Sequence, residues 1–160
     1  MDREAAPASP GELVWRLHAR WGDMDFNAHM RNTAYLDVSG DVRMRFFAEH
    51  GFSMRDFERL AVGPVILRDE LAYFRELRLL DPFDVSLALG GASADGSRFR
   101  MLNEFRRPDG ERCAEVVSIG GWLDLRARRF TEPPAELQDA LATLPRATPF
   151  EELPSLVRRR

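Results

Sequence analysis

The 160-residue sequence contains no lysine, and all of its 23 basic residues are arginine. A Schiff-base or general-base lysine is therefore excluded from any mechanism. Cysteine is nearly absent too, because Cys113 is the only one. No disulfide can form within the chain, and a reducing, cytoplasmic compartment is expected. With only three histidines beside that cysteine, a Cys/His zinc site is not expected.

Two further absences narrow the class of protein. No apolar run approaches the roughly 18 residues of a membrane span, and the acidic start lacks the features of a signal peptide. The net charge of −3 disfavours nucleic-acid binding. The 44% hydrophobic and 31% charged residues are typical of one soluble globular domain. We expect no nucleic-acid or membrane partner, no metal and no other cofactor.

Hydrophobic patterning predicts an α+β domain. An apolar stripe at i, i+4 spacing predicts one long helix from Met30 to His50, and a shorter helix or turn follows at 53–60. Alternation of apolar and polar residues, together with turn positions, predicts five strands, at 13–21, 62–77, 83–90, 98–106 and 112–125. Short turns such as RPDGE at 107–111 favour antiparallel pairing, so the helix should pack on one antiparallel sheet.

The ends of the chain and three glycine positions complete this outline. We expect a flexible tail at 1–12, a domain over 13–137, and a C-terminal tail at 138–160; from residue 126 onward a short helix and a loose end should follow. Gly51 should end the long helix in a left-handed conformation. The pair Gly120–Gly121 indicates a bulge or a close approach. Close packing against the sheet would explain Gly40 inside the helix.

The segment DFNAH at 25–29 gathers polar side chains just before the long helix. In an extended stretch, Asp25, Asn27 and His29 project to the same side. A helix N-terminus offers unpaired backbone N–H groups that can stabilise an oxyanion. A carboxylate beside such groups suits acyl transfer. The residue types leave a second interpretation open, in which Asp23, Asp25 and Asn27 only cap the helix.

The string GDMDFNAHMRNTAYLD at 22–37 resembles the D-x-D-x-x-G-H-x-N-N-x-x-Y signature of hotdog-fold thioesterases, the 4-hydroxybenzoyl-CoA thioesterase-like superfamily. It is also similar to the D-x-N-x-H-V-N-N segment of acyl-ACP thioesterases. The resemblance covers about residues 13–137 and includes LAYFREL at 71–77 and Trp122. It implies a hotdog fold that hydrolyses an acyl-CoA or acyl-carrier-protein thioester to free acid and thiol. It also implies a homodimer or a dimer-based homotetramer.

The same resemblance implies catalytic roles. Asp25 would be the nucleophile or the general base, and the two mechanisms stay open. The backbone N–H of Asn32 would polarise the thioester carbonyl. Supporting roles would fall to Asn27, His29 and Glu76.

The sequence departs from the family pattern at two positions. Ala28 replaces the usual glycine before the histidine, and because alanine favours negative φ, the turn should differ slightly. Arg31 replaces the first asparagine of the N-N pair, and it could narrow the pocket mouth or meet a carrier phosphate.

Two groups of residues are candidates for substrate binding, and each group could instead have a purely structural role. Apolar residues could line an acyl slot or simply form the core: Tyr35, Val38, Val42, Phe46 and Phe74. Arginines could bind carrier phosphates or simply lie in solvent: Arg68, Arg75, Arg128 and Arg129.

Two rival functions remain on the same fold. A hotdog-fold enoyl-CoA hydratase carries a G-D-x-N-P-x-H spacing. Here His29 comes one position too early and no proline follows Asn27. A non-catalytic acyl-thioester-binding module is the second rival, because a fold does not fix a function. It has no need of an ionised carboxylate beside the acyl carbonyl.

Overall fold

The structure, a computed structural model, describes residues 11–158, so the predicted tail at 1–12 lies almost entirely outside the described residues. The described residues form three α-helices, one 3₁₀ turn and eight strands. In chain order these are β1 Val14–His18, η1 Trp21–Asp23, α1 Asn32–Glu49, α2 Met54–Leu60, β2 Val62–Tyr73, β3 Pro82–Ser86, β4 Ala88–Ser93, β5 Arg98–Arg106, β6 Arg112–Asp124, β7 Arg129–Thr131, α3 Ala135–Ala142 and β8 Arg146–Leu153.

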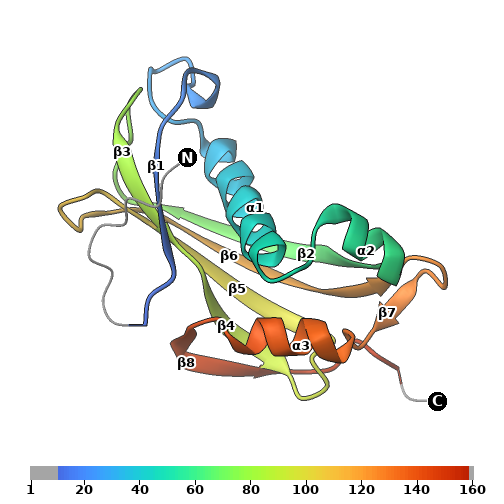
Figure 1. The fold of residues 1–160 in the computed structure, drawn as a ribbon. Coiled ribbons are helices and arrows are strands. Elements are labelled where there is room, and N and C mark those ends of the chain that lie inside the picture. The colour runs from blue at the N-terminus through green and yellow to red at the C-terminus, as the bar shows by residue number, and fades with distance from the viewer. Residues whose placement is uncertain (1–10, 159–160) are drawn as a thin grey trace.

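The strands form one sheet with the helices against one face (Figure 1). Strand β6 pairs with β2, β5 and β7, and β5 pairs with both β3 and β4. Strand β1 extends the sheet beyond β3, and β8 extends it beyond β4. All pairings are antiparallel except that of β4 with β8, which is parallel. The predicted α+β hotdog architecture, with a long helix on an antiparallel sheet, is confirmed. None of the described helices is long and apolar enough to cross a membrane.

The predicted number of five strands is too low for two reasons. The expected strand at 83–90 is divided at Leu87, because the side-chain amide of Asn103 donates to the backbone oxygen of Ser86, at 2.9 Å, in place of a ladder hydrogen bond. The C-terminal part of the chain also adds β7 and β8. The predicted short helix there is α3, but the expected loose end contains a strand, in which Leu153 pairs with Ser93 of β4.

The long helix forms because its apolar positions recur on one face. Val38, Val42 and Phe46 are no more than 4% exposed. These three residues therefore belong to the core, which favours a structural role over an acyl slot. Gly51 has φ +86, so the predicted left-handed helix end is confirmed. The suggested close packing at Gly40 is wrong, because a Cβ there would meet no atom within 4 Å.

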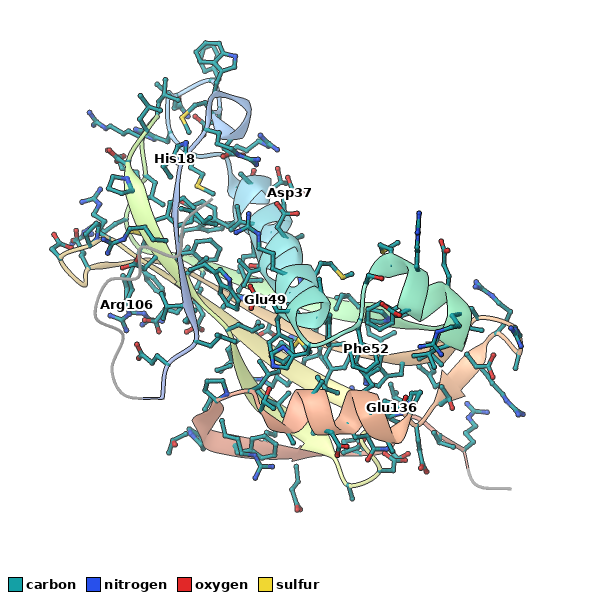
Figure 2. All side chains as sticks on the ribbon, viewed as in Figure 1. His18, Asp37, Glu49, Phe52, Arg106 and Glu136 are labelled. Atoms are coloured by element: carbon teal, nitrogen blue, oxygen red, sulfur yellow. The ribbon has the colours of Figure 1, made fainter. Side chains whose placement is uncertain are left out.

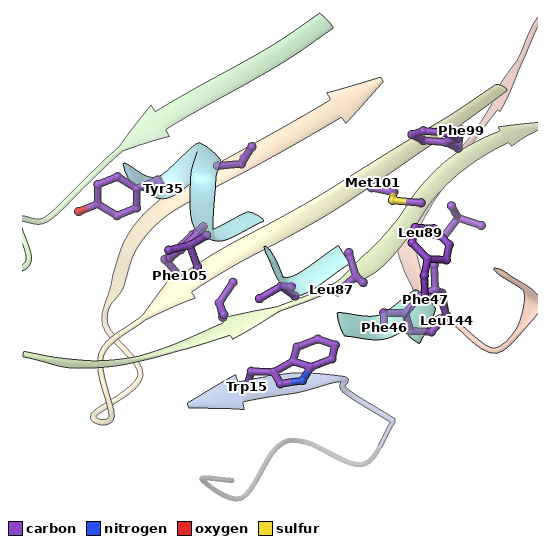
Figure 3. Close-up of a cluster of buried hydrophobic side chains, with 14 of the residues drawn as sticks. Trp15, Tyr35, Phe46, Phe47, Leu87, Leu89, Phe99, Met101, Phe105 and Leu144 are labelled. Atoms are coloured by element: carbon purple, nitrogen blue, oxygen red, sulfur yellow. The ribbon is translucent and has the colours of Figure 1, made fainter. Parts of the chain in front are cut away.

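Aromatic packing holds the C-terminal end of α1 to the sheet (Figure 3). The ring of Phe47 lies 5.8 Å from that of Trp122, which is fully buried and also contacts Phe57 and Phe99. A Cβ at Gly120 would lie 2.3 Å from the oxygen of Val65, so the predicted close approach of strands is confirmed. These contacts fix the helix, and hence its N-terminus, relative to β2.

Candidate active site

The loop at 20–31 (the catalytic loop) forms a small hairpin that docks on the segment at 74–81 after β2. Met24 and Met30 form an antiparallel bridge, and Asp25 N–H donates to His29 O at 2.8 Å. Met30 N–H donates to Leu77 O at 2.7 Å, which ties the hairpin to the segment at 74–81. Backbone hydrogen bonds on both sides therefore fix the position of Asp25.

Asp23 anchors the start of this loop. It is 3% exposed and accepts hydrogen bonds from the backbone and guanidinium of Arg20. Burial alone would raise the pKa of Asp23, but the hydrogen bonds and charge of Arg20 hold it below its ordinary value. Asp23 is thus an ionised structural group that is already paired.

The carboxylate of Asp25 is held on one side only. Its Oδ1 accepts from the backbone N–H of Asn27 at 2.8 Å and of His29 at 3.1 Å. Its Oδ2 has no hydrogen-bond partner among the described residues. The helix cap is Arg31, and no side chain caps α1 there. The capping interpretation therefore does not account for Asp25, which stabilises the hairpin and leaves one oxygen available.

Ala28 adopts φ +61, in the left-handed region, so the expectation that it keeps a negative φ is wrong. Its N–H donates to Asp25 O at 3.2 Å and closes the tip of the hairpin. The hairpin imposes this conformation, which glycine adopts without strain and which costs an alanine about 1 kcal/mol. The loop thus has a left-handed residue at the position where the family signature carries glycine.

His29 and Glu76 form a pair beside Asp25. The imidazole Nε2 lies 3.0 Å from Glu76 Oε2, while the backbone N–H of the same histidine holds Asp25. The guanidinium of Arg78 donates to the other oxygen of Glu76 at 3.0 Å. The guanidinium of Arg107 donates to the backbone oxygen of Glu76 at 2.6 Å. Glu76 is therefore fixed in position and orients the histidine ring.

The first turn of α1 faces the same space. Asn32 is its first residue, and its N–H has no acceptor among the described residues, as expected at a helix start. The phenol of Tyr73 donates to the backbone oxygen of Asn32 at 2.9 Å. Arg31 bonds Thr33 Oγ1 and pairs with Asp37, which projects from the outer side of α1 (Figure 2). Its guanidinium is thus already engaged with neighbouring groups.

A cavity of about 340 Å³ joins these elements. It is lined by Asp25, His29, Met30, Asn32, Tyr35, Tyr73, Phe74, Arg75 and Glu76. Seven of the predicted site residues thus meet here, whereas Asn27 and Arg68 do not line the cavity. Asn27 contributes its backbone N–H to Asp25. Arg68 lies in the middle of β2 and pairs with Glu70.

Two lining residues, Met30 and Tyr73, were not among the predicted site residues. Tyr73 is the last residue of β2 and lies within LAYFREL at 71–77, and its place in this segment of the family resemblance is the signal that could have identified it. Burial raises the pKa of Tyr35 to about 12 and also raises that of Tyr73. Both phenols therefore stay protonated at neutral pH and can donate a hydrogen bond.

One arginine, Arg75, lines the pocket and already has a partner. Arg75 pairs with Glu111 at 2.8 Å, with exposed fractions of 63% and 38%. Phe74 lies under the guanidinium of Arg112, whose carbon is 4.4 Å from the ring centroid. Arg128 and Arg129 lie at β7 and do not line this cavity. Only Arg75 of the suggested phosphate-binding arginines is therefore at the mouth.

A family model described as the thioesterase-like superfamily matches residues 19–141, and the chain belongs to this superfamily. The predicted enzyme class, a thioester hydrolase, is confirmed by that membership. Comparison with curated protein sequences gives no match.

Solved structures with the same fold include three informative ones. A hypothetical protein from Staphylococcus aureus in complex with CoA is 23% identical, with a TM-score of 0.74 over 86% of this chain and 88% of that one. A 1,4-dihydroxy-2-naphthoyl-CoA thioesterase from Synechocystis is 14% identical, with a TM-score of 0.74 over 82% and 96%. A probable thioesterase from Escherichia coli is 18% identical, with a TM-score of 0.68 over 82% and 97%. At these identities the likeness shows the shared fold.

Proposed function

We propose that this chain hydrolyses an acyl-CoA thioester and that Asp25 is the reacting carboxylate. One observation carries the proposal: Asp25 and the first turn of α1 line the same open cavity, and one carboxylate oxygen of Asp25 has no hydrogen-bond partner within residues 11–158. Membership of the thioesterase-like superfamily supports thioester hydrolysis. CoA is favoured as the carrier because one structural neighbour contains it, and an acyl-carrier protein is the second candidate. A cytoplasmic location, predicted from the single cysteine, belongs to the same proposal.

In this proposal the thioester carbonyl oxygen accepts a hydrogen bond from the Asn32 N–H. The free oxygen of Asp25 then attacks the carbonyl carbon, or it removes a proton from an attacking water. Negative charge develops on the carbonyl oxygen, where the helix N-terminus stabilises it, and the CoA thiolate leaves. After direct attack, water hydrolyses the mixed anhydride of the acyl group and Asp25, which releases the free acid and restores the carboxylate; with an attacking water, the free acid forms directly. The loss of one such donor typically lowers kcat by roughly 10²–10³. The geometry fits both mechanisms.

His29 and Glu76 act in this proposal by positioning Asp25. Because the backbone of His29 holds Asp25 and its ring contacts Glu76, a change at Glu76 reaches the carboxylate through the histidine. Arg75 is proposed to meet a carrier phosphate by exchanging its ion pair with Glu111, since an exposed pair of this kind contributes little stability. Asn27 contributes only through its backbone, and Arg68 has no proposed role in this cavity.

We also propose that the chain forms a homodimer, alone or within a tetramer, through the outer edge of β2. One side of β2 pairs with β6, and the other side has no strand partner within residues 11–158. Ile66 and Leu67 on this strand are 38% and 49% exposed. A long unpaired apolar edge is a template for pairing with another strand. Sedimentation of the wild type and of Leu67→Asp tests this proposal. The wild type should sediment as a dimer or tetramer, and the buried charge in Leu67→Asp should shift that variant towards monomer.

Thiol release separates the proposed function from its two rivals. The wild-type protein is offered short, medium, long and aromatic acyl-CoAs together with an enoyl-CoA. Release of free CoA from at least one thioester supports the proposal. Hydration of the enoyl-CoA without thiol release would identify a hydratase. A bound thioester that persists for hours would identify a binding module.

A further inference from the structure

A second, smaller cavity lies further along α1, on the side that faces β2. Its volume is about 160 Å³, and its walls come from α1, β2 and β5: Gly40, Arg43, Met44, Phe47, Pro64, Ile66, Phe99 and Met101. Asn32 and Gly40 are eight residues apart on one helix, which corresponds to about 12 Å of helical rise. The cavity, called the distal slot below, is therefore within reach of a medium-length acyl group attached at Asn32.

Gly40 leaves one side of the distal slot open. Glycine is unfavourable inside a helix. No close contact requires it at position 40, because a Cβ there would meet no atom within 4 Å, and its φ is not positive. Leu36 and Leu71, both half-buried, lie between the catalytic cavity and the slot along α1 and β2. An acyl chain that runs along α1 from Asn32 to the slot would therefore meet apolar side chains.

Arg43 is the exception in these mostly apolar walls. Its Nε donates to Ser39 O at 3.0 Å, and its side chain lines the slot together with Gly40. Its Nη1 is shielded from solvent and has no hydrogen-bond partner among the described residues. Asp69 lies on the neighbouring strand, but its carboxylate accepts from Ser118 Oγ at 2.5 Å and forms no ion pair with Arg43.

Burial lowers the pKa of Arg43, and the nearby charge of Asp69 opposes that shift. A shielded, unpaired N–H is unfavourable and is rare in folded proteins. Arg43 Nη1 therefore lacks a hydrogen-bond acceptor within residues 11–158, although Asp69 supplies part of the charge compensation. An oxygen atom of a ligand would supply that acceptor.

We propose that Arg43 hydrogen-bonds an oxygen atom at the far end of the acyl group, so that the preferred substrates are oxygenated acyl-CoAs. This inference rests on the proposed thioesterase function and specifies its substrate class. A distance of about 12 Å, less about 3 Å for the hydrogen bond, corresponds to on the order of seven extended bonds. A terminal hydroxyl, carbonyl or carboxylate oxygen on a chain of about eight carbons would fit.

Three CoA thioesters of equal chain length test this: octanoyl-CoA and its analogues with a terminal hydroxyl or a terminal carboxylate. The wild type should show a kcat/KM at least about tenfold higher for one or both oxygenated analogues than for octanoyl-CoA. The ratio between the two analogues tells which oxygen is preferred. Arg43→Met, which removes every donor, should reduce this preference about tenfold, whereas Arg43→Gln, which keeps an N–H, should retain part of it.

Arg45→Met is the matched control, because this arginine lies on the same helix and lines neither cavity. Its substrate ratio should equal that of the wild type. Equal rates for all three substrates in the wild type would overturn the inference alone. The inference would also be overturned if Arg43→Met lowered kcat/KM equally for all three substrates and sedimentation showed a shift towards monomer. That result would assign Arg43 to subunit pairing. No thiol release from these three, with release from another acyl-CoA of the panel, would also overturn the inference alone, whereas no release from any thioester of the panel would overturn the proposed function as well.

Gly40→Leu provides a second test that does not alter charge. The leucine should fill the distal slot and lower the ratio of kcat/KM for the preferred eight-carbon substrate over acetyl-CoA by about tenfold. An unchanged ratio would show that the acyl chain does not enter the slot.

Discussion

At the N-terminal end of α1, backbone hydrogen bonds hold the catalytic loop to the segment at 74–81, whereas at the other end aromatic rings pack around Trp122. The first end leaves Trp21 82% exposed and Phe26 fully exposed, while Phe47 at the second end is 2% exposed. Polar groups near the pocket are thus positioned without being buried. The difference indicates that stability comes mainly from the aromatic end, while the proposed chemistry lies at the hydrogen-bonded end.

The comparison predicts very different effects of the same truncation at the two ends. Phe47→Ala should lower the free energy of unfolding by about 3–5 kcal/mol, because it leaves a cavity beside Trp122. Phe26→Ala, at the tip of the catalytic loop, should change it by no more than about 0.5 kcal/mol. Urea denaturation of both variants measures these values. A similar decrease in the free energy of unfolding in both variants would contradict the difference in stability between the two ends.

Acidification should weaken the end opposite the catalytic loop through Asp95, which links the β4–β5 turn to Ser155. Burial alone would raise the pKa of Asp95, but hydrogen bonds from Ser155, Ser93 and Ser97 hold it well below the ordinary 3.8. A depressed carboxyl pKa stabilises the fold above the unfolded-state value, and this stability is lost as the pH falls below about 4.

Asp95→Asn should therefore cost about 1 kcal/mol at pH 7, and the cost should shrink as the pH falls from 4 towards 2. Unfolding curves at several pH values provide the measurement. A cost that stays constant over this range would show that the charge of Asp95 is not responsible.

At the catalytic end, Tyr73→Phe removes the hydrogen bond to the backbone of Asn32 without removing the ring. Because the bond positions the first helical turn, kcat should fall about 3–10-fold, while the free energy of unfolding changes by no more than about 1 kcal/mol. Steady-state kinetics and thermal melting check both values. A rise in KM with unchanged kcat would instead place Tyr73 in substrate binding.

The smallest effect is expected at Ala28. Ala28→Gly should raise the free energy of unfolding by up to about 1 kcal/mol, because glycine adopts φ +61 without strain. Ala61→Gly, at the left-handed end of α2, is a matched variant that should give a similar gain away from the pocket. A loss of stability in Ala28→Gly alone would show that the methyl group packs usefully in the hairpin.

Features that depend on local sequence could be predicted well. The long helix, the left-handed Gly51 and the close approach at Gly120 follow from spacing and backbone preference. The division of the strand at Leu87 could not be predicted, since it depends on a side chain 17 residues away from Ser86. Strand β8 could not either, because it pairs with β4 more than 50 residues earlier.

The candidate site shows the same limit. The motif predicted Asp25, His29 and Asn32, because these residues lie within one short segment. The structure brings Glu76 to the same cavity and adds Tyr73, whereas Arg68, only a few residues earlier on β2, lies elsewhere. Alternation of side chains along a strand and the bulge between Ile66 and Arg68 decide which residues of β2 face the helix.

The account rests most directly on Asp25, and thiol release by Asp25→Asn tests it. This variant keeps the size of the side chain and an oxygen for the two backbone N–H groups, so its thermal melting should match that of the wild type. With a thioester that the wild type hydrolyses, kcat should fall by at least about 10²-fold, because the nucleophile or base is lost. A kcat within about threefold of the wild-type value would contradict the assignment of Asp25 as the reacting carboxylate.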